Sequence, residues 1–293
     1  MSNTTMAPIS ALMTAPTSSM QTLISAWTNN LVMSLKLRLR ERQTMFWTFL
    51  FPIFFLFIFA KIFAGGKPEG LAMLMGGLLC ISAMAQGFFG MSIGLVTMRE
   101  RGILRRYRLA PIKAWLIISS ELVASYVMLM MTAAVQLAIA RFAFGMSIKG
   151  NLVTLFIALT VGALAFLAIG FIVAGVADNA RSAQVMSNVF YFPLMFLGGA
   201  AIPLQFLSPG MRSVSRLLPS RYMTNSLGRV ITGGESLRAI TPDLLVLGVT
   251  FIVSVFVAAK LFRWEAKEPM PWKQKAWAAA IVVVFVLAAL LVK

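Results

Sequence analysis

The chain has 293 residues, of which 59% are hydrophobic and only 12% are charged, and its mean hydropathy is +0.86. This composition excludes an ordinary soluble domain and indicates a protein that is dissolved mainly in a lipid bilayer. The net charge is +17, but the Lys and Arg residues gather at the ends of apolar runs, which favours lipid headgroups and a docking partner over nucleic acid.

The sequence has no histidine and a single cysteine, Cys80, which lies inside an apolar run. Disulfides, zinc sites and histidine acid-base chemistry are therefore excluded, and no metal or catalytic site is expected. There is also no Gly-x-x-x-x-Gly-Lys-Ser/Thr motif to hold the phosphates of ATP. We expect a chain that is not an enzyme and binds no cofactor, so that energy comes from another polypeptide.

Residues 1–20 are rich in Ser, Thr, Pro and Ala and lack the charged start and apolar core of a signal peptide, so we expect a disordered cytoplasmic tail. Residues 21–43 begin with apolar residues at helical spacing, but Leu alternates with Lys or Arg over residues 35–40. Alternation favours a strand, whereas an interfacial helix lets the basic side chains reach the headgroups. We predict an amphipathic helix, because a lone strand beside a membrane leaves its backbone unpaired.

Six apolar runs are long enough to cross the roughly 30 Å hydrocarbon layer as helices. The second run is rich in glycine, which allows close contact between helices in lipid, so it is predicted to be a packing helix. A seventh apolar run covers residues 276–292 and follows a charged linker, so residues 264–293 are predicted to form a linker and an extra span. The first six runs are residues 45–64, 71–98, 114–140, 152–177, 183–204 and 244–262.

Residues 99–113, here called the basic segment, lie between the second and third runs and contain six Lys or Arg residues. Short loops rich in Lys and Arg are retained in the cytoplasm, which fixes the orientation of the other spans. With a cytoplasmic N-terminus, 16 of the 26 basic residues lie inside. An ordinary cytoplasmic loop would show the same charge bias.

Within the basic segment, Glu100, Gly102 and Pro111 form a Glu-x-Gly pattern followed by a basic turn and a Pro nine positions after the Gly. This pattern resembles the ABC-2 family of bacterial ABC-transporter permeases, and the resemblance extends over residues 21–262. It implies a six-helix bundle of the type V exporter kind over residues 44–263, an amphipathic N-terminal elbow helix and an inner-membrane location. It also implies a second permease copy and a separate ATPase subunit that binds ATP and Mg.

In that family the segment corresponding to residues 99–113 is a coupling helix that fits a groove on the ATPase. The resemblance implies that three arginines dock on acidic residues of the ATPase, that Gly102 and Pro111 shape the ends of the turn, and that Glu100 orients it. The coupling residues are then Arg99, Glu100, Arg101, Gly102, Arg105, Arg106, Arg108 and Pro111.

Residues 205–234, after the fifth run, are predicted to form two short amphipathic helices at the outer surface or dipping into it. Ser208 and Pro209 form a helix start, Pro219 separates two apolar stripes, and Gly233 with Gly234 ends the second. This arrangement resembles the re-entrant outer helices of drug-exporting ABC-2 permeases.

Glu121 lies about two turns into the third run, where burial of a carboxylate in lipid is costly and invites a role in binding a substrate or an ion. Pairing at the interface is the alternative for this residue. Tyr126, Gln136 and Gln184 are further candidates to line a pathway, and helix packing is the alternative for each.

The sequence therefore predicts the membrane subunit of an ATP-driven exporter that works by alternating access. Abundant Phe, Met and Leu, with few Tyr or Trp to stack on sugars, favour a lipophilic substrate. One alternative is a polysaccharide or teichoic-acid permease of the same family. The other is a stand-alone secondary transporter or channel, against which stand the few ionisable residues in the spans.

Overall fold

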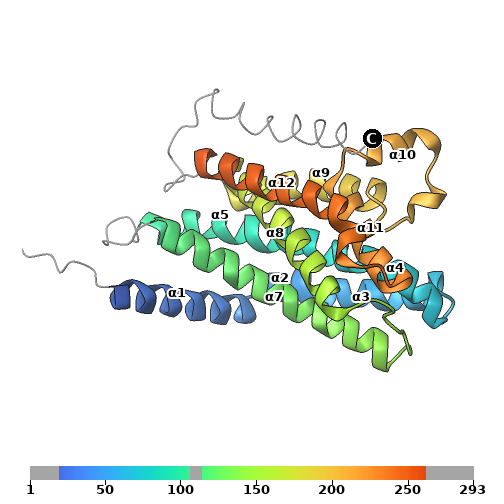
Figure 1. Cartoon of the computed structure of the whole chain (residues 1–293). Coiled ribbons are helices and arrows are strands. Elements are labelled where there is room, and N and C mark those ends of the chain that lie inside the picture. Colours follow the sequence, from blue (N-terminus) through green and yellow to red (C-terminus); the bar gives the residue numbers. More distant parts are fainter. Residues whose placement is uncertain (1–19, 106–113, 262–293) are drawn as a thin grey trace, which may run out of the picture.

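The computed structural model describes residues 20–105 and 114–261. Every regular element in these two ranges is a helix, which confirms the predicted all-α polytopic fold. Most of the predicted N-terminal tail, the end of the basic segment and the predicted seventh span lie outside the described residues. Figure 1 shows the long helices running back and forth along one common direction.

The first part of the described chain contains the N-terminal helix and the elements of the first two predicted spans. They are α1 (Met20–Arg40), α2 (Arg42–Met45), the π-helical η2 (Phe46–Leu50), α3 (Phe51–Ile58), the π-helical η3 (Phe59–Phe63), α4 (Pro68–Ala85), the π-helical η4 (Gln86–Ser92) and α5 (Ile93–Glu100). The second part contains α7 (Ala114–Phe142), α8 (Leu152–Val176), α9 (Ala180–Leu197), the short 3₁₀ helix η5 (Leu204–Phe206), α10 (Pro209–Ser215), α11 (Pro219–Gly233) and α12 (Leu237–Leu261).

Within the described ranges, four helices are long and apolar enough to cross a membrane, so the protein is a multi-pass membrane protein. They cover Pro68–Glu100, Leu116–Phe142, Leu152–Val176 and Leu237–Leu261. The first predicted span is represented by a shorter apolar helix, Thr48–Phe63, and the fifth by α9, which has 18 residues and carries Pro193 and several polar side chains.

The second span is the central helix of the bundle, since 89% of its apolar window is buried. Its glycines let neighbouring backbones approach closely, which confirms the predicted packing role. A Cβ added to Gly87 would lie 2.3 Å from the carbonyl oxygen of Phe166 on α8, and one added to Gly170 would lie 2.0 Å from the carbonyl oxygen of Gly87. The two backbones therefore cross at a point where no side chain fits.

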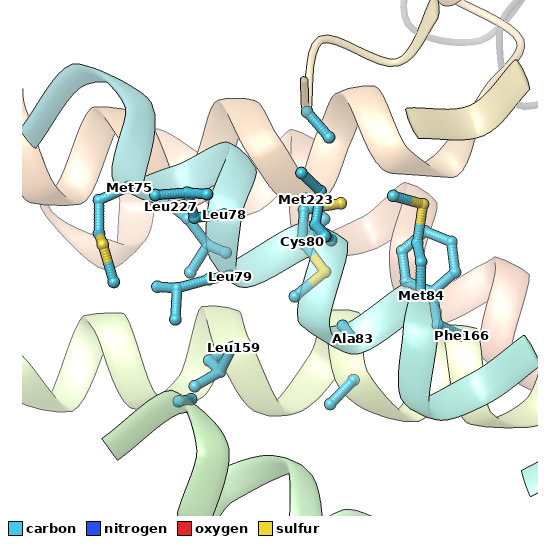
Figure 2. Close-up of a cluster of buried hydrophobic side chains, with 14 of the residues drawn as sticks. Met75, Leu78, Leu79, Cys80, Ala83, Met84, Leu159, Phe166, Met223 and Leu227 are labelled. Atoms are coloured by element: carbon cyan, nitrogen blue, oxygen red, sulfur yellow. The ribbon is translucent and has the colours of Figure 1, made fainter. Parts of the chain in front are cut away.

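The core lies where this central helix meets α8 and α11. Figure 2 shows the side chains of α4 between those two helices. Cys80 is fully buried there, and its thiol contacts the carbonyl oxygen of Ser220 at 3.6 Å. The buried side chains labelled in this cluster are Met75, Leu78, Leu79, Cys80, Ala83 and Met84 of α4, Leu159 and Phe166 of α8, and Met223 and Leu227 of α11.

The two short helices predicted after the fifth run are present as α10 and α11. The hydroxyl of Ser208 accepts a hydrogen bond from the backbone N–H of Met211, and Gly234 ends α11 with a φ of 69°. The apolar stripe of α11 packs on α4, α8 and α12 and is buried inside the protein. In Figure 1 both helices lie at one end of the bundle, here called the far end, while residues 99–105 lie at the opposite, basic end.

Replacing Gly87 with Ala is expected to destabilise the protein by about 1–3 kcal/mol, because the new methyl group forces the backbones of η4 and α8 apart. Thermal unfolding of the purified protein in detergent measures this change. Gly248→Ala is the matched control, because a Cβ at that helical position meets no atom within 4 Å. Equal melting temperatures for the two variants would contradict the close crossing.

Candidate functional site

One face of α1 is hydrogen-bonded to the first turns of α7. The side chains on that face are spaced three or four residues apart, which places them on one side of a helix. Trp27 Nε1 donates to Ser119 Oγ at 3.0 Å, and Asn30 Nδ2 donates to Ser120 Oγ. The predicted N-terminal element is thus a helix, and the alternation over residues 35–40 does not produce a strand.

The same face of α1 ends in a buried ion pair. Arg38 Nη2 lies 2.8 Å from Glu121 Oε2, and the hydroxyl of Ser34 donates to the other carboxylate oxygen of Glu121. Arg38 Nη1 also donates to the carbonyl oxygen of Gly90 in η4 at 3.2 Å. Arg38 is 6% exposed and Glu121 is 3% exposed, so each charge depends on the other for its stability.

The pair explains how a carboxylate is accommodated near the start of the third span. Glu121 is held by α1 inside the protein, where Arg38 and Ser34 both bond to its carboxylate. Sequence reasoning missed Arg38 as its partner. Two signals in the sequence point to it. A carboxylate within a span needs a cation as its partner, and α1 has a polar face on which Asn30, Ser34 and Arg38 recur every four residues.

A buried polar stripe runs along α7 from the ion pair toward the C-terminal end of the helix. Its residues are Glu121, Ser125, Thr132 and Gln136, spaced by four, seven and four positions, and all are 3% exposed or less. The amide oxygen of Gln136 accepts from Ser82 Oγ at 2.7 Å, and its amide nitrogen donates to a backbone carbonyl of α3 at 3.1 Å. The predicted pathway residue Gln136 therefore joins three helices.

Thr132 of this stripe donates a hydrogen bond to a backbone carbonyl that lacks its usual N–H donor, because a proline stands at the donor position. Pro52 has no N–H to give to the carbonyl of Thr48, four residues earlier. The hydroxyl of Thr132 donates to that carbonyl at 3.0 Å, and the hydroxyl of Thr48 donates to Gln86 Oε1 at 2.7 Å. Such substitutes let a proline lie inside a membrane helix.

Arg99, the first residue of the basic segment, points into the protein. Its guanidinium donates to the carbonyl oxygen of Ala174 at 3.0 Å and to that of Ala177, and the residue is 5% exposed. These carbonyls belong to the last turn and the C-cap of α8, where helical carbonyls lack partners and a cation is favourable. Arg99 therefore ties the start of the basic segment to the end of α8.

The next charged residues of the basic segment are exposed, while Leu104 between them is buried. Gly102 has a φ of 70°, a left-handed conformation that glycine adopts without strain, and its N–H bonds to the carbonyl of Arg99. Glu100, Arg101 and Arg105 are exposed. Arg106, Arg108 and Pro111 lie outside the described residues.

Two cavities lie at the basic end and share Glu41, Thr97 and Arg101. The first, of about 360 Å³, lies between α1 and α5 with Glu121 at its inner side. The second, of about 480 Å³, lies between α5 and the start of α9 and includes Gln184. Its other lining residues are Ile93, Glu100, Ala180 and Arg181.

The remaining candidates lie apart from the ion pair. The Tyr126 hydroxyl is 2.9 Å from Thr160 Oγ1 and thereby links α7 to α8. The amide nitrogen of Gln184 is 3.4 Å from Asn188 Oδ1 on the same helix. Among the described residues, no group of three or more His, Cys, Asp or Glu residues is arranged to hold a metal ion.

A second charged cluster lies at the far end, where α11 meets α12. Arg229 forms ion pairs with Glu235 and, at 3.4 Å, with Asp243, which also accepts from Asn225 Nδ2 at 2.8 Å. The hydrogen bond from Arg229 lowers the pKa of Glu235 below its ordinary value. The ion pair between Arg229 and Glu235 is therefore kept at neutral pH, and it is lost as the pH falls through the lowered pKa of Glu235.

Comparison with known proteins adds a family relationship. The sequence model described as ABC-2 type transporter matches residues 20–231. YvfS of Bacillus subtilis, named as a transport permease, is 24% identical over 213 residues, which cover 70% of this chain and 84% of YvfS. YbhR and YbhS of Escherichia coli, named as multidrug ABC transporter permeases, are 21% and 23% identical, and the matches span 47% and 40% of their lengths.

Replacing Glu121 with Leu, or Arg38 with Met, is expected to destabilise the protein by about 3–5 kcal/mol, because each change leaves one buried charge without its partner. The double variant Arg38→Met with Glu121→Leu is expected to lose less stability than either single variant. Thermal unfolding in detergent measures all three.

Lys36→Gln is the matched control for these variants, since Lys36 is an exposed cation on the same helix. Additive effects of the two single changes in the double variant would contradict the mutual dependence of Arg38 and Glu121.

Proposed function

This chain belongs to the ABC-2 type transporter family, and on that premise we propose that it is the membrane-spanning subunit of an ATP-driven exporter. The multi-pass helical fold and the relatives named as multidrug ABC transporter permeases support this proposal. The subunit itself does not hydrolyse ATP. A separate ATPase subunit binds ATP and Mg and drives the cycle.

The observation that carries the proposal is the construction of residues 99–105. Arg99 is bonded inward to the end of α8, whereas Arg101 and Arg105, on either side of the turn at Gly102, are exposed. A partner that binds the exposed cations and moves them therefore transmits the movement to α8 through Arg99. In the proposed mechanism, the basic segment docks on acidic residues of the ATPase through Arg105, Arg106 and Arg108.

Transport proceeds by alternating access in an assembly of two permease copies and two ATPase subunits. Closure of the ATPase dimer on ATP moves the two basic segments together, and the helix bundles rock to open the pathway outward. The helix α9 offers an apolar face to the second copy and to the pathway between them. This face consists of the exposed residues Val185, Val189, Phe192 and Phe196, spaced by four, three and four positions.

The substrate is lipophilic, such as a drug, a lipid-like molecule or a secondary metabolite. Phe, Val and Leu are the most frequent of the large apolar side chains that are exposed, and the flexible Met side chains among them suit irregular ligands. The basic segment faces the cytoplasm of a bacterial cell and the protein lies in the inner membrane, which the distribution of Lys and Arg supports.

An ion-coupled transporter fits the described spans less well. Such a protein needs an ionisable group that can exchange its ion, whereas Glu121 is engaged by both Arg38 and Ser34. A glycan permease of the same family differs from the proposed exporter in its substrate and keeps the same coupling.

Changing Arg105, Arg106 and Arg108 together to Glu is expected to abolish transport and the co-purification of an ATPase subunit, because the docking charges are reversed. Affinity purification in mild detergent, with vanadate-sensitive ATP hydrolysis as the readout, measures the loss. The matched control reverses three exposed far-end or loop arginines, Arg141, Arg216 and Arg238.

The control variant is expected to retain the ATPase, whereas the variant with reversed charges at Arg105, Arg106 and Arg108 is expected to lose it. Equal co-purification of the ATPase with the two variants would contradict docking through these arginines. The absence of any ATPase from the unchanged protein would contradict it too.

A further inference from the structure

The cavity between α1 and α5 has two chemically different parts. Its volume is about 360 Å³, and it opens at the basic end of the bundle. One wall is apolar and includes Met33 and Leu37 of α1 and Met98 of α5. Met33 and Leu37 are each 58% exposed, so neither is covered by another helix. This wall matches the surface of an acyl chain.

The other part of the cavity is lined by charged side chains. Arg38 and Glu121 neutralise each other through their 2.8 Å contact. Arg40, Arg101 and Glu41 remain, which leaves an excess of one positive charge. The side chains of Arg40 and Arg101 form no hydrogen bond or ion pair within the part of the chain that the structure describes, so both guanidinium groups have donors to offer.

The position of these cations fits a lipid better than a soluble anion. Arg40 follows the last apolar residues of α1, and Arg101 follows the end of the second span, so both lie where spans meet the headgroup region. Basic pockets between helices at this depth bind anionic headgroups, and the adjacent apolar wall receives the chain of the same molecule. A zwitterionic lipid would bring its own ammonium group toward the arginines.

We propose that this cavity binds one anionic phospholipid, with its phosphate held by Arg40 and Arg101 and an acyl chain along Met33, Leu37 and Met98. The bound lipid joins α1 to the end of α5 directly beside the basic segment. The stability of this end of the protein therefore depends on the lipid composition of the membrane. This site does not depend on which substrate the protein transports or on how transport is driven.

Thermal unfolding of the purified protein in detergent, with added short-chain phosphatidylglycerol, tests the proposal. Phosphatidylcholine of the same chain length and glycerol phosphate are the comparison ligands. We expect phosphatidylglycerol to stabilise the protein more than either. Arg40→Gln and Arg101→Gln should each weaken its binding about fivefold, as expected for one basic side chain near an anionic headgroup. Both arginines are exposed, so these changes leave the fold intact.

Lys36→Gln is the matched control, because it removes an exposed cation of α1 that does not line the cavity. Weakening of the lipid effect by Lys36→Gln to the same extent would indicate general surface attraction and overturn the site. Equal stabilisation by phosphatidylcholine would overturn the choice of an anionic lipid. Equal stabilisation by glycerol phosphate would show a soluble phosphate site in its place.

Discussion

Arg38 and Glu121 can be buried only together, and the basic end of the protein is organised around that requirement. Their ion pair, with the added bonds from Ser34 and to Gly90, fixes α1 across α7 and against η4. The residues of α1 from Trp27 to Arg38 rise about 16 Å, while their partners on α7 are three consecutive residues, so the two helices cross. The cavity beside α5 exists because α1 is held in this position.

The same requirement that buried polar groups be paired accounts for the other polar residues in the spans. Thr132 bonds a carbonyl that a proline leaves without its usual donor, Gln136 joins α7 to α3 and α4, and Arg99 bonds the terminal carbonyls of α8. Each of these side chains connects helices that are distant in the sequence. The polar residues of the described spans named here therefore serve to join helices to one another.

The sequence was sufficient to predict features that depend on local patterns. Apolar run length predicted the helical membrane fold, Ser208, Pro209 and Gly234 predicted the short far-end helices, and the glycines of the second span predicted close packing. Composition could not show which charges would meet. Arg38 and Glu121 are 83 positions apart, and Arg38 belongs to a stretch whose alternation suggested a different element. The inward direction of Arg99 and the π-helical turns likewise depend on neighbouring helices, which no local pattern encodes.

In the proposed exporter, α1 and the basic segment are expected to move as one unit, because α1 is bonded to α7 and η4, Arg99 is bonded to the end of α8, and η4 packs on α8. Pulsed electron spin resonance tests it with a single spin label per copy at Lys36 on α1 or, separately, at Glu100, in a variant with Cys80 replaced by Ala. The assembly is measured without nucleotide and with ATP trapped by vanadate. Both distances between copies should shorten together on trapping. A change at Glu100 without one at Lys36, or no change at either position, would contradict the account.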